Sequence, residues 1–174
     1  PVIGKNTWIA PTAEIIGDVR IADNCYIGYG AILRGDYGAI IIGEGTAIEE
    51  GAMIHARPGD KTEIGCHVTI GHKAMLHNTT IKDYAVIGMN STVTDFSVVG
   101  EWSIIGEQSL VKRNQQIPPG KIYGGVPAAE IKNVEDKNRT EWTLAKKVYV
   151  ELAKQNLQGL KDITGEYEFR YIAE

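Results

Sequence analysis

Three histidines are the residues in this chain best suited to chemistry. His55 and His77 each follow directly after an aliphatic residue and are 22 residues apart, and His72 lies two residues after Ile70. Neutral imidazole is the commonest zinc ligand, and three imidazoles with one open position form a catalytic rather than a structural site. The three histidines therefore predict a metal centre. The fourth histidine, His67, has no stacked partner and is expected to be exposed to solvent.

The histidines lie within a six-residue repeat of aliphatic residues. Seventeen steps of the repeat run from Ile15 to Ile117, and the residue four positions after each aliphatic residue is nearly always small. Glycine often follows the aliphatic residue, where a bend between flat faces leaves no room for a side chain and is expected to need an unusual backbone angle. The repeat predicts a parallel β-helix with a triangular cross-section, three steps per coil and about six coils.

The length of a coil places two of the histidines next to each other. One 18-residue coil plus a four-residue bulge equals the spacing between His55 and His77. Their side chains should therefore lie on adjacent coils, roughly 4.8 Å apart. His72 belongs to the neighbouring step and faces a different side, so in a single chain it could not easily complete a site with the other two. In a trimer it could do so across the interface.

The repeat occupies most of the chain as one domain. The β-helix is expected over residues 1–122, and the prolines and glycines that follow Ile117 end it. A connecting segment is expected over residues 123–136. At this length the chain has no room for a second domain.

A helix is expected after the β-helix. Apolar residues at helical spacing predict a helix over residues 137–158, with Thr140 as its amino-terminal cap and Gly159 as its stop. The apolar stripe predicts that the helix packs along the side of the β-helix. The tail over residues 159–174 is polar and mixed, and no structure is predicted for it.

Composition excludes several classes of function. The formal net charge is −4 and the charges are scattered, so neither a nucleic-acid-binding stripe nor a basic membrane patch is expected. No stretch approaches the roughly 18 apolar residues of a membrane-spanning helix, and the amino terminus shows no basic-then-apolar leader. A cytoplasmic protein with a small-molecule substrate is the expectation.

Four short motifs resemble one family. The motifs Leu33-Arg34-Gly35-Asp36, Ile54-His55, Ile70-Gly71-His72 and Leu76-His77 are similar to those of the gamma-class carbonic anhydrases and their relatives in phenylacetate and carnitine catabolism. The resemblance covers about residues 7–157. The family consists of left-handed β-helix homotrimers of the hexapeptide-repeat group.

The resemblance also implies roles for particular residues. His55 and His77 of one subunit and His72 of the next would bind zinc, or ferrous iron or cobalt, at each subunit interface. Arg34 and Asp36 would form an intersubunit pair that borders the site.

The chain departs from the family pattern at two places. Glu49 stands where the family usually has glutamine; it is expected within hydrogen-bonding reach of metal-bound water, as a base or as added negative charge. The long acidic loop that carries the family's proton-shuttling glutamate is replaced by the short segment 56–61.

Tyr149, on the predicted helix, resembles a family tyrosine that reaches over the metal.

Four functions are compatible with these residues. The expected one is a carbonic anhydrase-like lyase of modest activity, in which metal-bound hydroxide attacks carbon dioxide to give bicarbonate. An acyl-CoA thioesterase could use the same metal site. A hexapeptide-repeat acyltransferase would share the coil and a cap like Gly125-Val126-Pro127-Ala128, but those enzymes usually depend on one histidine. A non-catalytic assembly subunit that binds metal is the fourth alternative.

Overall fold

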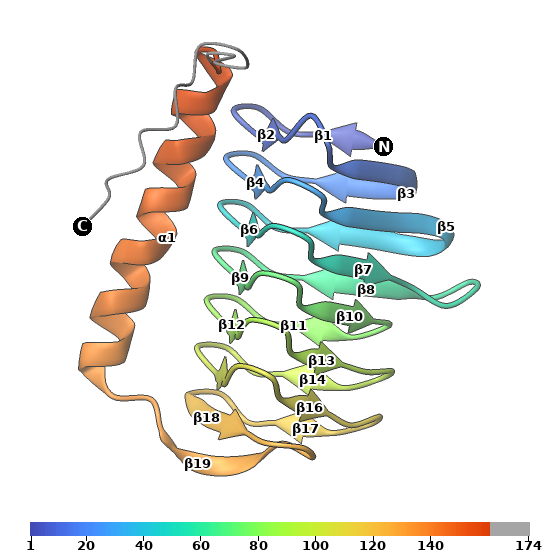
Figure 1. The fold of residues 1–174 in the computed structure, drawn as a ribbon. Helices are drawn as coiled ribbons and strands as arrows, with labels where there is room; N and C mark the ends of the chain where they lie inside the picture. The colour runs from blue at the N-terminus through green and yellow to red at the C-terminus, as the bar shows by residue number, and fades with distance from the viewer. Residues whose placement is uncertain (161–174) are drawn as a thin grey trace, which may run out of the picture.

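The chain folds as a left-handed parallel β-solenoid of about seven turns with one long helix along its side (Figure 1). The fold class predicted from the repeat and the resemblance is thus confirmed. The computed structural model describes residues 1–160. The tail residues 161–174, for which no structure was predicted, lie outside the described residues.

Each turn contributes one segment to each of three faces, which we number in chain order. Face 1 consists of β1 (Val2–Ile3), the second halves of β3 (Glu14–Ile21) and β5 (Ile32–Ile42), β8 (Lys61–Ile64), β11 (Thr80–Ile81), β14 (Val98–Val99) and β17 (Gln116–Ile117). Face 2 consists of β2 (Trp8–Ile9), β4 (Tyr26–Ile27), β6 (Ala47–Ile48), β9 (Thr69–Ile70), β12 (Val86–Ile87), β15 (Ile104–Ile105) and β18 (Lys121–Gly124). Face 3 consists of the first halves of β3 and β5, β7 (Met53–His55), β10 (Met75–His77), β13 (Thr92–Val93) and β16 (Leu110–Val111). A final strand, β19 (Ala129–Asn133), pairs antiparallel with β18.

The first turn was missing from the predicted count. Ile3 and Ile9 on β1 and β2 precede Ile15 at the same six-residue spacing, and Tyr123 on β18 continues the spacing beyond Ile117. The estimate of about six coils was therefore one too low, because the count began at Ile15.

Parallel pairing in register stacks the repeat positions into columns. Ile54 on β7 pairs with Leu76 on β10, and Ile64 on β8 pairs with Ile81 on β11. These aliphatic side chains point inward and are at most 1% exposed. Burying an aliphatic side chain of this size contributes about 1.5–3 kcal/mol. The column of large side chains, with small buried residues such as Ala52 beside it, therefore supplies the main stabilisation of the solenoid.

The glycines that follow the aliphatic residues were predicted to leave no room for a side chain and to need an unusual backbone angle. Only the first of these predictions is correct. A Cβ atom on Gly43 would lie 2.5 Å from the backbone carbon of Gly65 in the next turn, so bulk is indeed excluded there. Gly43 does not, however, have a positive φ. The left-handed conformation, with φ near 60°, occurs two residues after the position that corresponds to Gly43. Asn24, Tyr84 and Trp102 are examples from other turns. The close approach of neighbouring turns, and not backbone angle, therefore requires these glycines.

The corner between faces 3 and 1 is irregular, and this irregularity frames the histidines. Strands β3 and β5 continue through the corner without a break, whereas residues 56–60 project between β7 and β8. The buried Asn78 side chain holds this projection, because its Nδ2 donates to Asp60 Oδ2 (2.9 Å) and its Oδ1 accepts from the Arg57 amide (3.1 Å). The loop is therefore fixed beside His55 and His77.

Helix α1 (Asp136–Leu157) runs back along face 2 toward the first turns (Figure 1). Its N-cap is Glu135, which forms a capping box with Asn138; Thr140 was the wrong choice because its hydroxyl donates to the Asp136 carbonyl within the helix. Ala153 is fully buried against a cluster that includes Trp8 and Tyr26 on face 2. No helix within residues 1–160 combines the length and the apolar character needed to cross a membrane.

Candidate metal centre

Two of the predicted ligands lie side by side at the corner between faces 3 and 1, which we call corner 3–1. His55 at the end of β7 and His77 at the end of β10 are direct partners in the parallel pairing, and their ring centroids are 5.2 Å apart. Arg34 on β5 is the next residue in the same column. The adjacency predicted from the spacing is confirmed, and metal binding by the pair stays a prediction.

A carboxylate fixes the orientation of the His77 ring. Asp95 Oδ1 lies 2.5 Å from His77 Nδ1, and the Arg57 guanidinium donates to Asp95 Oδ2 at 3.0 Å. Desolvation alone would raise the pKa of Asp95, but its contacts with His77 and Arg57 outweigh it and hold the pKa below the ordinary value. An ionised Asp95 accepts the Nδ1 proton of His77 and so leaves Nε2 as a lone-pair donor for a metal.

Arg34 controls the lone pair of the other histidine. Its Nη2 lies 3.1 Å from His55 Nε2, and its Nε donates to Asp36 Oδ1 at 3.1 Å. Because a guanidinium can only donate, His55 Nε2 accepts this hydrogen bond and carries no proton. Desolvation would raise the pKa of Asp36, but the charge of Arg34 and the hydrogen bonds to the carboxylate together lower it. Arg34 and Asp36 thus pair within one chain, and their contact across an interface stays a prediction.

His72 lies at the opposite edge of face 3, at the corner between faces 2 and 3, which we call corner 2–3. Its Nε2 is 3.2 Å from Glu49 Oε2 and its Nδ1 is 2.8 Å from Glu50 Oε2. The backbone amide of His72 also donates to Glu49. Glu49 therefore accompanies His72 and not His55 or His77, because a six-residue step carries the chain onto the next face.

Tyr149 joins the cluster at corner 2–3 from the helix. Its hydroxyl is hydrogen-bonded to the buried Glu49 side chain, and its ring packs edge-on against Tyr26 at 5.1 Å. Burial and the neighbouring carboxylate raise the pKa of Tyr149 above its ordinary value, so it stays protonated at neutral pH and donates to Glu49. A groove of about 490 Å³ beside these residues is lined by His72 and Trp142 as well.

One chain does not by itself complete a metal site in the part that the structure describes. Within residues 1–160, no three His, Cys, Asp or Glu side chains converge on a common point. The donors nevertheless suit zinc: two neighbouring imidazoles have unprotonated Nε2 atoms, and a carboxylate orients one of them. The third imidazole lies at the other edge of the same face, where a neighbouring copy could present it.

Replacing Asp95 with asparagine is expected to weaken metal binding by about 10- to 100-fold, because the amide no longer fixes the His77 tautomer through a charge-assisted hydrogen bond. Competition with a fluorescent zinc chelator measures the affinity. Replacing the exposed Asp18, which pairs only with Arg20 at 2.9 Å, is the matched control and should leave affinity unchanged. Equal affinities for the Asp95 variant and the wild type would show that this carboxylate plays no part in the site.

The expectation for His67 was wrong. Its ring is partly buried and stacks on Tyr84 at 5.1 Å, and Tyr84 stacks in turn on Trp102 at 4.6 Å. These three residues form a column of rings at the corner between faces 1 and 2, on the far side of the molecule from face 3. The one-coil spacing that paired His55 with His77 could have found this column.

Two other site residues were missed at the sequence level. Asp95 follows His77 by 18 residues, the length of one regular coil, so the same count could have placed it. The other is Lys146, a buried lysine of helix α1 whose Nζ donates to Thr69 Oγ1 at 3.0 Å. It had no such signal, since its surroundings depend on how the helix docks.

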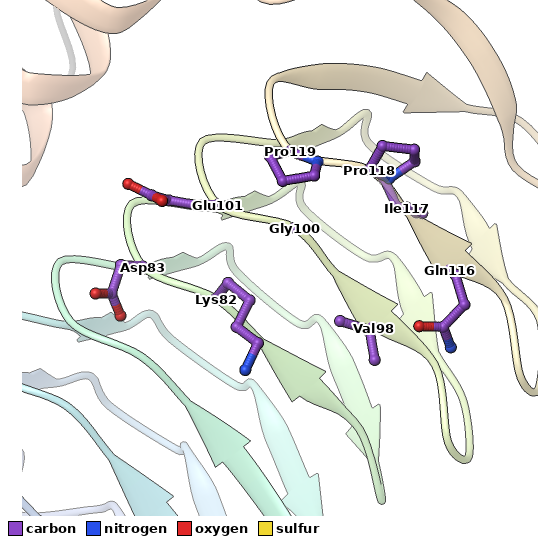
Figure 2. A pocket seen from close by; sticks show the side chains of 9 residues that line it. All are labelled: Lys82, Asp83, Val98, Gly100, Glu101, Gln116, Ile117, Pro118 and Pro119. Carbon is purple, nitrogen blue, oxygen red and sulfur yellow. The ribbon is translucent and has the colours of Figure 1, made fainter.

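A separate groove of about 650 Å³ lies on face 1 (Figure 2). It is open and lies over β11, β14 and β17, with Lys82, Val98 and Gln116 among its lining side chains. None of the candidate site residues lines it, so this groove is separate from the candidate metal centre.

Comparison with known proteins agrees with the fold and the motifs. The family model described as "Bacterial transferase hexapeptide (six repeats)" matches residues 1–35 and 61–95. The mitochondrial gamma carbonic anhydrase 2 of Arabidopsis thaliana is 36% identical over 159 residues, which cover 88% of this chain and 57% of the relative. A probable carbonic anhydrase of Methanocaldococcus jannaschii is 39% identical over 136 residues, which cover 78% of this chain and 86% of the relative.

A solved structure is also similar over most of its length. The crystal structure of a hexapeptide transferase family protein from Anaplasma phagocytophilum superposes with a TM-score of 0.85 at 35% identity, covering 89% of this chain and 92% of that one. The chain spans only a little over half of the plant relative's length, at 57%. The 39% identity over 86% of the M. jannaschii protein, together with the hexapeptide repeat of this chain, shows that the chain belongs to the gamma carbonic anhydrase family.

Proposed function

We propose that the chain is one subunit of a homotrimeric, metal-dependent carbonic anhydrase that converts carbon dioxide and water to bicarbonate and a proton. The observation that carries the proposal is the division of the site between the two edges of face 3. Two oriented imidazoles lie at corner 3–1, and a third imidazole with a buried carboxylate lies at corner 2–3. Corner 3–1 lacks a third imidazole ligand, and corner 2–3 of a neighbouring copy would supply it.

The outward side of face 3 supports a trimer. Ile32, Met53, Met75 and Leu110 stand in one column along it, which also contains Glu14 at its start and Thr92. In the corresponding column of face 1, four of the seven residues are polar: Val2, Arg20, Ile41, Glu63, Thr80, Val98 and Gln116. Face 2 is covered by the helix. Of the two faces that the helix leaves uncovered, face 3 has the more apolar column. Such a surface is the kind that a second copy covers.

A threefold arrangement around face 3 would join opposite edges of neighbouring chains. Corner 2–3 of one subunit, with Glu49 and Glu50, would then meet corner 3–1 of the next, with Arg34 and Arg57. Arg34 and Arg57 each already pair with a carboxylate of their own corner, Asp36 and Asp95, so the orientation rests on completing the ligand set and not on charge. His72 of one subunit would complete the ligand set of His55 and His77 of its neighbour.

Zinc, ferrous iron or cobalt would suit three imidazole ligands. When bound, the metal supplies a coordinated water of lowered pKa that can attack carbon dioxide at neutral pH. Asp95 orients His77. Arg34 keeps His55 Nε2 unprotonated, and a bound metal would replace Arg34 at that lone pair. Glu49, held by Tyr149 and His72, offers a buried hydrogen-bond acceptor next to the third ligand.

Transfer of an acyl group is the alternative favoured by the transferase names of the family model and of the Anaplasma structure. The paired imidazoles argue for metal chemistry instead. The cytoplasmic location stays a prediction.

Hydration of carbon dioxide by anaerobically purified, metal-loaded protein tests the proposal. The loaded protein should raise the rate well above that of the same protein treated with chelator. A background rate at full metal content, together with hydrolysis or transfer from acyl-CoA substrates, would replace the proposal with the thioesterase or transferase alternative.

A further inference from the structure

A buried amine lies between the helix and the solenoid, away from the ligands already described. The Lys146 side chain is only 4% exposed, and its Nζ donates to Thr69 Oγ1 (3.0 Å) and to the Ala85 carbonyl (3.2 Å). Both acceptors are neutral. A neutral amine has two N–H groups, so these two contacts satisfy it completely and leave its lone pair free to accept a proton.

Lys146 stands in the wall between two grooves on opposite flanks of the helix. Thr69, its hydrogen-bond partner, lines the groove that holds Glu49, His72 and Tyr149. Lys146 itself lines a second groove of about 470 Å³, which lies beside His67 and Tyr84. The contact between Lys146 and Thr69 therefore links the candidate catalytic side of the helix to a separate opening.

The electrostatic surroundings favour a group that can exchange protons near neutral pH. Burial lowers the pKa of Lys146 from its ordinary 10.5 to about 7, and the negative charge of Glu49 partly opposes that shift. The charged and titratable groups around the amine are Glu49 on the catalytic side and, along the second groove, His67, Tyr84, Lys147, Glu151 and Lys154. The Trp142 ring lies 5.7 Å from Nζ.

We propose that Lys146 is a proton-transfer residue, which takes up the proton released by carbon dioxide hydration on the Glu49 side of the helix and gives it to buffer in the second groove. The inference rests on the proposed function.

The proton balance of the step is simple. Hydration converts CO₂ and H₂O into HCO₃⁻ and H⁺. The neutral amine of Lys146 takes up that proton on its lone pair to become an ammonium group. For Thr69 to pass the proton on, its hydroxyl must turn and donate to Nζ, the reverse of the contact in which Nζ donates to Oγ1. The ammonium then gives the proton to a buffer base in the second groove and returns to the neutral amine. No oxidant, reductant or further reactant is required.

Lys146→Met and Lys146→Arg test the proposal in the metal-loaded trimer. Both variants should lower kcat about tenfold or more at low buffer concentration, because neither side chain can exchange a proton at neutral pH. Both should leave kcat/KM within about twofold of the wild type, since that ratio reports the attack on carbon dioxide and not proton removal. Imidazole buffer should restore kcat. Lys147→Met, at a neighbouring lysine of the same groove, should leave both constants unchanged.

The arginine variant separates proton transfer from a structural role. Arginine keeps the positive charge and the hydrogen-bond donors, so full kcat in Lys146→Arg would overturn the proposal. A parallel fall of kcat and kcat/KM in both variants would overturn it too, because that pattern reports a distorted site.

A second measurement needs no metal and no turnover. Nitrogen-15 NMR of the metal-free protein should show one lysine amine, absent from Lys146→Met, that titrates near pH 7. A Lys146 titration above about pH 9 would overturn the proposal whatever the enzyme does. If the amine titrates near pH 7 but the loaded trimer hydrates no carbon dioxide, the proposed function has failed and Lys146 has no proton from this reaction to carry.

Discussion

Replacing His77 with alanine is expected to remove the metal from every site of the trimer and to lower carbon dioxide hydration by on the order of 10³-fold. His77 is one of two imidazoles at corner 3–1, and the remaining His55 with a single imidazole from the neighbouring chain would leave the ion only two protein ligands. Metal analysis after gel filtration and a hydration assay on the same sample measure both effects.

His67→Ala is the control for the loss of an imidazole. His67 lies in the column of rings at the corner between faces 1 and 2, so its removal should leave metal content and hydration unchanged. Stoichiometric metal in His77→Ala, or loss of metal in His67→Ala, would contradict the assignment of the ligands.

Replacing Met75 with aspartate is expected to break the trimer and, with it, to abolish both metal binding and hydration. Met75 is 37% exposed in the single chain and stands in the middle of the apolar column of face 3, between Met53 and Thr92. A trimer would bury an unpaired carboxylate there at each subunit interface, which costs about 3–5 kcal/mol. Analytical ultracentrifugation reports the oligomeric state.

The matching substitution on face 1 is Val98→Asp. Val98 is an outward-facing strand residue of similar character, but it lines the open groove and not the proposed interface (Figure 2). This variant should remain a metal-loaded trimer. A Met75→Asp protein that stays trimeric and active would show that face 3 is not the interface.

The solenoid could be predicted from sequence because its repeat is local and countable. A fixed number of residues per coil stacks Ile54 on Leu76, and the same count stacks His55 on His77. The excluded bulk at Gly43 also followed from the repeat. The backbone angle did not, because the position that adopts the left-handed conformation is occupied by asparagine, lysine or aromatic residues as well as glycine.

The surroundings of the site were less predictable, since they depend on contacts between elements distant in sequence. Glu49 was expected near His55 by its place one step earlier, but a step turns the chain by one face and brings Glu49 to His72 instead. The environment of Lys146 is set by the docking of the helix on face 2. Its two hydrogen-bond partners, Ala85 and Thr69, lie 61 and 77 residues earlier in the sequence. No periodicity in the sequence encodes that contact.

The most direct test of the shared metal site is to mix two inactive variants, His72→Ala and His77→Ala. Each variant alone should bind no metal as a homotrimer. A His72→Ala chain still offers His55 and His77, and a His77→Ala chain still offers His72, so a mixed trimer purified through two different tags contains one complete interface. The mixed trimer should hold about one metal ion and show about a third of the wild-type hydration rate. Mixed trimers without metal, or either variant alone with full metal, would contradict a site divided between neighbouring subunits.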